Sequence, residues 1–187
     1  MNRILLIALL FPLLGLSQKK QDNKAYLRSI LSGGLLIGEK DSYPVYQWSG
    51  GLHINRYFGG VGIGYDRYRF NSIPVFADFR ADIGEKKLVY VYANGGYAIP
   101  GKYKELEEFN KIVDKLKGGF YMDLGVGYRM RLSPVHSILL SAGYTRKEMT
   151  QEKIYKYSWC PTCDESIYRF NYKLDRIVVK ASWEFGR

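Results

Sequence analysis

Two cysteines are the residues of this sequence with the most obvious chemistry. Cys160 and Cys163 are its only cysteines and are separated by Pro-Thr, a spacing that thiol–disulfide oxidoreductases use at a helix N-terminus to activate the first thiol. Here the motif lies in a predicted long loop beside Trp159 and Asp164. We therefore predict a local disulfide that tightens this loop in an oxidising compartment. A metal would need two further ligands, and no other Cys or His is nearby in the sequence.

The two histidines give weak evidence for catalysis. His136 precedes Ser137 in a predicted turn, whereas a His–Ser pair that hydrolyses or transfers acyl chains of lipid A would need a strand and an acidic partner. His53 is expected on the inward face of a strand as a hydrogen-bonded residue. The sequence has no P-loop, no GxGxxG motif in a βαβ unit and no zinc signature. We predict no catalytic residue, cofactor or metal, and keep a lipid-A-modifying enzyme as an alternative.

Charged residues recur at every second position of several segments, which places them on one face of a strand. The predicted inward set is Arg28, His53, Asp66, Asp78, Arg80, Asp82, Asp123, Arg129, Arg131, Lys180 and Glu184. An eight-stranded barrel is just wide enough inside for side chains to fill it, and a lone buried charge is costly. We expect a salt-bridged lumen that holds the barrel together; an ion-leaky pore and a ligand site are the alternatives.

The strands that carry these residues are predicted from alternation of apolar with polar residues. Gly118–Glu148 shows it best, as two strands joined at Leu132–His136, each with an apolar face and a face of glycines and charges. The other predicted strands are Tyr26–Gly38, Val45–Arg56, Gly60–Phe70, Ile73–Ile83, Leu88–Ile99 and Tyr168–Phe185. In the last strand the apolar phase changes near Asp175, which indicates either a β-bulge or a strand that continues beyond the membrane.

The lengths of the connections predict how the strands are arranged. The short connections, all at one end, are Tyr57–Gly59, Gly84–Lys87 and Leu132–His136. The other end carries two long loops, Pro100–Lys117 and Thr150–Ile167, and apolar residues at helical spacing predict a short helix over Tyr103–Leu116. This asymmetry is typical of bacterial outer-membrane barrels, and a closed barrel satisfies every backbone hydrogen bond in lipid. The predicted fold is all-β: an eight-stranded antiparallel up-and-down transmembrane β-barrel.

The first residues predict export. Arg3 gives a positive start, Ile4–Leu16 is an apolar run, and small residues suit cleavage after Ser17. The run is too short for a spanning helix. The predicted domains are therefore a signal peptide, residues 1–17, and an outer-membrane barrel, residues 18–187.

Composition supports a membrane barrel and argues against nucleic acid as a partner. The 17 tyrosines and 20 glycines suit a β-protein with aromatic girdles and curved strands. The net charge of +10 is scattered, without a basic helix or stripe. We expect it to favour the phosphates of lipopolysaccharide or other anionic lipid.

Three segments carry a family resemblance: the leader, the strand IPVFADFRADIG (Ile73–Gly84) and the terminal aromatic strand KASWEFGR (Lys180–Arg187). They resemble the small outer-membrane β-barrel proteins of Bacteroidetes-type bacteria, which are similar in architecture to OmpA and OmpX. The resemblance covers the mature chain. It implies an outer-membrane location and insertion by the barrel-assembly machinery, and it carries architecture rather than activity.

The leading functional hypothesis is a non-enzymatic envelope protein that contacts a surface ligand or partner protein through the loops at 100–117 and 150–167. An accessory subunit of a secretion or transport assembly and a lipid-A-modifying enzyme are the membrane-bound alternatives. A soluble lipocalin-like carrier, also an eight-stranded barrel, would require the apolar faces to point inward.

Overall fold

The computed structural model describes residues 25–38, 41–67, 70–101, 112–155 and 166–186. Their regular structure consists of β1 (Ala25–Ile37), β2 (Ser42–Ile54), β3 (Tyr57–Asp66), β4 (Ser72–Ile83), β5 (Val89–Pro100), β6 (Ile112–Lys117), β7 (Gly119–Arg131), β8 (His136–Tyr155) and β9 (Ser166–Gly186). No helix long and apolar enough to cross a membrane occurs in the part of the chain that the structure describes.

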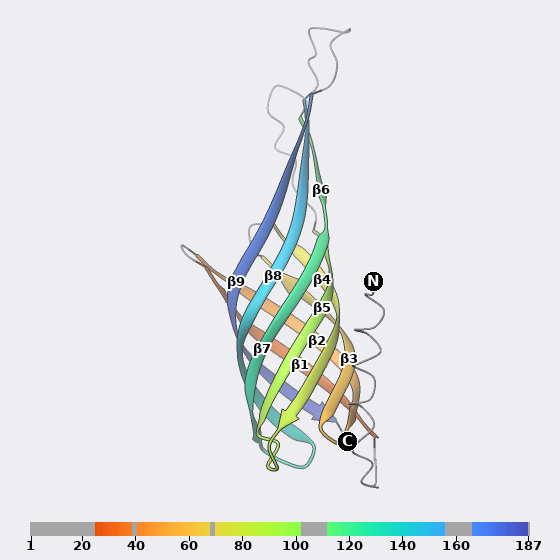
Figure 1. The fold of residues 1–187 in the computed structure, drawn as a ribbon, viewed down its shortest axis with the longest axis vertical. Helices are drawn as coiled ribbons and strands as arrows, with labels where there is room; N and C mark the ends of the chain where they lie inside the picture. The colour runs from red at the N-terminus through yellow and green to blue at the C-terminus, as the bar shows by residue number, and fades with distance from the viewer. Residues whose placement is uncertain (1–24, 39–40, 68–69, 102–111, 156–165, 187) are drawn as a thin grey trace, which may run out of the picture.

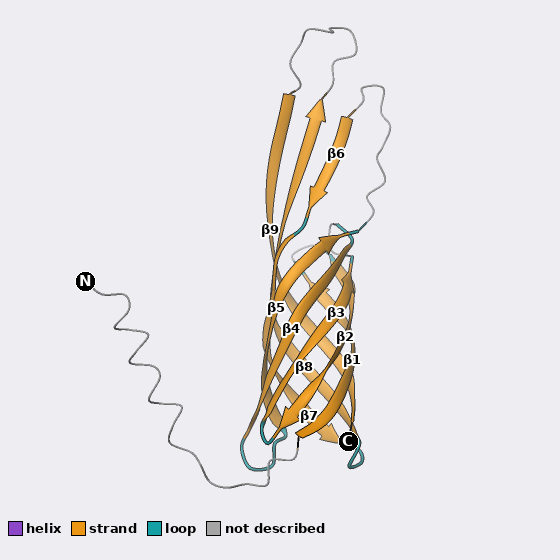
Figure 2. Ribbon diagram, turned by 90° about the vertical axis from the view of Figure 1, so that its right-hand side faces the viewer, coloured by secondary structure: helices purple, strands orange, loops and turns teal. Residues whose placement is uncertain are grey.

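Eight of these strands close into a barrel (Figures 1 and 2). The order around the wall is β1-β2-β3-β4-β5-β7-β8-β9, every neighbouring pair is antiparallel, and β9 returns to pair with β1. β6 pairs with β8 beyond the barrel wall. The predicted eight-stranded antiparallel barrel is confirmed.

The wall is polar inside and apolar outside. Along β4, buried Asp78 alternates with Val75 and Phe79, which are 45% and 61% exposed. Large apolar side chains are exposed in the same way on each of the other barrel strands. This is the arrangement of a barrel with lipid as its solvent. The lipocalin-like alternative is wrong, because it requires the apolar faces inside.

Short turns join the strands at one end, where β9 also ends (Figure 2). The β2–β3 turn is a two-residue hairpin at Asn55–Arg56, two residues earlier than predicted, and Asn55 takes a positive φ of 57° that Asn tolerates. The β4–β5 turn contains Gly84 with a φ of 75°. The third turn follows Arg131, as predicted.

The opposite end differs from the prediction. Residues 112–116 of the predicted helix form strand β6, while residues 103–111 lie outside the described residues. The predicted loop Thr150–Ile167 is strand at both ends, because β8 and β9 stay paired as far as Tyr155 and Ser166. The pairing with β8 satisfies the backbone of residues 112–117, and this tertiary pairing overrides the helical spacing of the apolar residues.

The last strand contains no bulge near Asp175. The β8–β9 register is unbroken from His136↔Phe185 to Tyr155↔Ser166, whereas β1 stops pairing with β9 at Ile37↔Ile177. Of the two sequence-based explanations, the strand that continues beyond the barrel is correct. The even-numbered residues of β9 point into the lumen within the barrel. Beyond the rim, even-numbered residues continue the same face of the strand.

We call the part beyond the rim the extension: β6, residues 148–155 of β8 and residues 166–175 of β9. Its β9 part, residues 166–175, is ten residues long, or about 30 Å at the rise of a β-strand. Figure 2 shows the extension projecting beyond the barrel. A bulge creates its third strand: Lys117 pairs with Thr150 but Tyr121 with Lys147, so three residues of the β6–β7 strand oppose two of β8. A Cβ on Gly118 would lie 2.0 Å from the Ala98 carbonyl oxygen, which explains the glycine.

Candidate lumen network and extension surface

A chain of hydrogen-bonded side chains, four of them acidic or basic and one a histidine, crosses the lumen at the short-turn end. His53 Nε2 lies 3.2 Å from Asp82, Arg129 Nη1 donates to both oxygens of Asp82 at 2.6 and 2.7 Å, and Arg129 Nη2 donates to Glu184 at 3.2 Å. Arg28 completes the chain with a 2.8 Å bond to Glu184. The five residues come from β2, β4, β7, β9 and β1, so the chain ties separate parts of the wall together.

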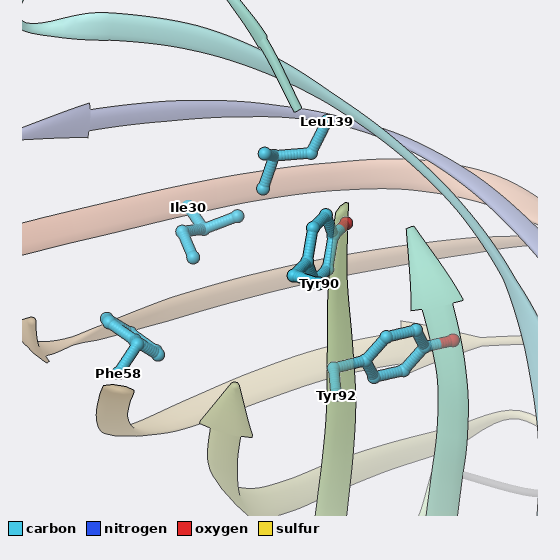
Figure 3. Close-up of a cluster of buried hydrophobic side chains, with 5 residues drawn as sticks. All are labelled: Ile30, Phe58, Tyr90, Tyr92 and Leu139. Atoms are coloured by element: carbon cyan, nitrogen blue, oxygen red, sulfur yellow. The ribbon is translucent and has the colours of Figure 1, made fainter. Parts of the chain in front are cut away.

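The next layer combines ions with aromatic rings. Asp78 accepts bonds from Arg80 Nη2 at 2.8 Å and from the Ser49 hydroxyl at 2.7 Å. The Arg80 guanidinium lies 5.8 Å from the Phe58 ring centre and 5.7 Å from that of Tyr90, within cation–π range. Figure 3 shows Phe58 and Tyr90 beside Ile30, Tyr92 and Leu139, which fill the lumen here.

Above this layer Asp123 is the shared acceptor. Lys180 Nζ donates to it at 2.6 Å and the Tyr92 hydroxyl at 2.9 Å. Lys180 also lies 4.4 Å from the Tyr92 ring centre and donates to Gln47, whose amide donates to the Tyr121 hydroxyl at 2.7 Å. The cost of burying the Lys180 ammonium group is therefore offset by an ion pair with Asp123, a hydrogen bond to Gln47 and a cation–π contact with Tyr92.

A last pair lies near the mouth. Lys147 Nζ bonds to Asp66 and, at 2.9 Å, to Ser72, whose hydroxyl donates to Asp66 at 3.0 Å. Lys147 is absent from the sequence-based set, although the alternation in its strand would have included it.

The sequence-based inward set is mostly buried in these layers. Arg28 is partly exposed at the short-turn end, and Arg131 is exposed as the last residue of β7. The buried tyrosines Tyr90, Tyr92 and Tyr121 also fill the lumen, although the sequence-based inward set of charged residues does not include them. The signal that would have found two of them is the glycine opposite each: Tyr90 pairs with Gly127 and Tyr92 with Gly125.

Aromatic and charged side chains leave a small cavity near the mouth of the described lumen. This cavity, bounded in part by Leu36, Tyr121 and Lys147, has a volume of about 10 Å³, enough for one water. Among the described residues, no group of three or more His, Cys, Asp or Glu side chains is placed to hold a metal ion. The acidic and basic side chains of these layers lie beside groups of opposite charge, as in Arg80–Asp78, Arg129–Asp82 and Lys180–Asp123.

The lumen-side face of the extension is aromatic and leans over the mouth. The Tyr172 ring packs at a tilt against Phe70 of the β3–β4 connection, with 5.4 Å between the ring centres, and its hydroxyl donates to Gln151 at 3.1 Å. Nearer the tip, Tyr168 and Phe170 share this face and are 54% and 43% exposed. The base of the extension is thus packed, and its tip presents aromatic rings to solvent.

The outer face of the extension is charged. Glu152 accepts hydrogen bonds from Lys117 Nζ at 2.8 Å and from Arg169 Nε at 3.1 Å, and these two cations lower the pKa of its carboxyl. Arg146 bonds to Asp175 at 2.7 Å and lowers the pKa of that carboxyl to about 2. The two faces of the extension therefore suit different contacts.

Three sequence-based predictions concern residues outside the lumen and the extension: the cysteine pair, the signal peptide and His136. Cys160, Cys163 and the predicted signal peptide, residues 1–17, lie outside the described residues. His136 begins β8 at the surface, where its Nδ1 accepts a 3.3 Å bond from Trp183 Nε1. This contact occupies one imidazole nitrogen in a structural role.

Comparisons with known proteins support the barrel fold and assign neither a family nor a function. The sequence matches no protein-family model and no curated protein. Among solved structures it is similar to the outer membrane protein AlkL in lipid bilayers (TM-score 0.55, 9% identity, 91% of this chain and 94% of that one). It is also similar to the outer membrane protein OprG from Pseudomonas aeruginosa (TM-score 0.56, 9% identity, 88% of this chain and 97% of that one). At such identities the likeness concerns the fold alone: this chain has the fold of small transmembrane β-barrel proteins, and the Bacteroidetes-type family stays a prediction.

Proposed function

We propose that the protein is a non-enzymatic barrel of the bacterial outer membrane whose extracellular extension binds a surface ligand. The apolar outer wall, the short turns at one end and the similarity to outer-membrane barrels support the location. With the short turns in the periplasm, the extension stands on the cell surface. Insertion then depends on the barrel-assembly machinery.

The lumen supports a structural rather than a catalytic or conducting role. Its buried charges are engaged with one another, as in the chain from His53 through Asp82 to Arg129. A catalytic acid or base needs access to substrate, whereas the lumen cavity has room for one water. The binding activity is therefore assigned to the outside of the barrel.

The observation that carries this proposal is the exposed aromatic pair Tyr168 and Phe170. Aromatic rings supply a large contact area at low entropic cost. They lie on a paired, three-stranded extension held at its base by the Tyr172–Phe70 contact, so they are presented on a supported surface. A platform of this kind suits a surface polysaccharide or a protein.

Photo-crosslinking in living cells tests the proposal. A photoreactive residue at position 168 is expected to give a discrete adduct, identified by mass spectrometry and lost when Phe170→Ser is introduced. The matched control is a photoreactive residue at position 167, because Ile167 is 61% exposed on the opposite face of the same strand. Equal adducts at both positions, or none at 168, would contradict a specific aromatic surface.

A second candidate is an accessory subunit of a secretion or transport assembly. Within the described residues, positions 166–176 of β9 pair with β8 alone, so the other backbone edge of this part of β9 is open. An open edge accepts an additional strand from a partner protein. Co-purification of one protein in a stoichiometric amount favours this candidate. A lipid-A-modifying enzyme, in contrast, predicts a changed lipid-A mass on expression, and we expect that mass to be unchanged.

A further inference from the structure

The bulge at Gly118 opens a notch at the rim of the barrel. Below it, β7 pairs with β5 as far as Gly119↔Ala98; above it, the chain leaves β5 and follows β8 as β6. A hollow of about 560 Å³ lies between the end of β5 and the outer face of the extension. The residues that line this hollow include Tyr97, Pro100, Lys117, Glu152, Arg169 and Asn171.

The notch has an excess of positive charge. Lys117 and Arg169 both bond to the same oxygen, Oε1 of Glu152, so two cations share one carboxylate. Their hydrogen bonds with Glu152 use one of the three N–H groups of Lys117 and one of the five of Arg169. The Lys117 and Arg169 side chains are 58% and 64% exposed, which leaves their remaining donors accessible to a ligand.

The notch lies at the depth of lipid headgroups. Tyr97 pairs with Phe120 across β5 and β7, and these outward-facing rings, 52% and 48% exposed, lie close to the rim end of the apolar band, which reaches Ile99 on β5. Aromatic rings of this kind mark the membrane–water interface. Lys117 precedes Phe120 by three residues, which places it about 10 Å further from the membrane centre, on the outward face.

We propose that this notch binds a phosphate group of an anionic lipid in the outer leaflet, the chemistry that lipopolysaccharide presents on lipid A. Lys117 and Arg169 provide charge-assisted hydrogen bonds to the phosphate oxygens. Glu152 holds the two cations together, and Tyr97 packs at the boundary of headgroup and acyl chains. The inference rests on the proposed outer-membrane location but is independent of the ligand at Tyr168 and Phe170.

Lipid binding by the purified barrel tests this site. Wild type and a Lys117→Gln, Arg169→Gln variant are titrated in detergent micelles with bisphosphorylated lipid A, and bound lipid is counted by native mass spectrometry. The variant is expected to bind at least about tenfold more weakly. The control, Arg56→Gln with Lys86→Gln, removes the same charge from the turns at the opposite end of the barrel and is expected to bind like wild type.

Four outcomes would overturn the proposal. Equal weakening in both variants would indicate general electrostatic attraction, and no weakening in either would leave the notch without a role. Wild-type binding of dephosphorylated lipid A as tight as that of the phosphorylated form would exclude the phosphate. Full competition by excess inorganic phosphate would indicate a site for the free ion. A gel shift on boiling checks that each variant is a closed barrel, and because the assay uses purified protein, its result stands apart from crosslinking at position 168.

Discussion

Arg129 and Asp82 meet across the lumen rather than along the wall. Both oxygens of Asp82 lie within 2.7 Å of Arg129 Nη1, although their strands, β4 and β7, are separated in the sheet by β5. The two side chains are only 2% and 3% exposed. Because Arg129 also donates to Glu184 on β9, one guanidinium connects three strands of the barrel.

Replacing that guanidinium is expected to destabilise the barrel strongly. Arg129→Met preserves much of the side-chain volume but leaves Asp82 and Glu184 short of a cation in a buried site, at a cost of about 3 kcal/mol. The measurement is the free energy of unfolding in urea, followed by the gel mobility of folded and unfolded barrels in lipid or detergent.

Arg131→Met is the matched control, since Arg131 lies two residues further along β7 and is exposed. Its change is expected to stay within about 0.5 kcal/mol. Similar losses in the two variants would show that the lumen chain does not brace the barrel.

Gly127→Ala is expected to destabilise the barrel by steric overlap inside the lumen. Its Cβ would lie 2.4 Å from the Tyr90 ring, and overpacking of this kind costs about 1–3 kcal/mol. Combining it with Tyr90→Leu is expected to recover part of the loss in the same unfolding assay. Gly95→Ala, where the Cβ would have no neighbour within 4 Å, serves as the control. A loss as large in the control would point to the backbone and not to the tyrosine.

The barrel is expected not to conduct ions. Its lumen is crossed by ion pairs such as Lys180–Asp123, and the cavity near its mouth holds about 10 Å³. Planar-bilayer recordings of the purified protein, with a large porin as the positive control, should show no stable open level. A reproducible open level would mean that the bracing leaves a pathway through the barrel.

The Arg146–Asp175 pair, which joins the barrel part of β8 to the base of the extension, is expected to persist into acid. Hydrogen bonds from Arg146 lower the pKa of Asp175 from 3.8 to about 2. Because the folded-state pKa is depressed, the favourable contribution of the pair is present above pH 3.8 and is lost as the pH falls towards 2. Carboxyl NMR of labelled aspartate measures the titration, and Arg146→Gln should return the Asp175 pKa towards its ordinary value. A titration unaffected by that substitution would contradict the pairing.

Alternation along each strand was sufficient to predict the barrel. Asp78, Arg80 and Asp82 fall on one face of β4 because side chains of a strand point alternately to its two sides, and the amount of apolar surface on the other face requires lipid. The short turns and the antiparallel order follow from chain lengths between such strands. All of this information is local in the sequence.

Pairing partners were decided only by the tertiary structure. The residues around 112–117 have apolar side chains at helical spacing, so the local sequence does not indicate a strand there. These residues become a strand because the projecting edge of β8 offers them backbone partners. Likewise Lys180 is predicted to point inward, but its choice of Asp123 as partner depends on barrel closure and on the stagger between β9 and β7. The sequence by itself determined which face each strand residue occupies, because that depends on strand periodicity. The ion pairs, the extension and the notch at Lys117 were decided by the tertiary structure, because they arise from contacts between distant segments that only the folded barrel brings together.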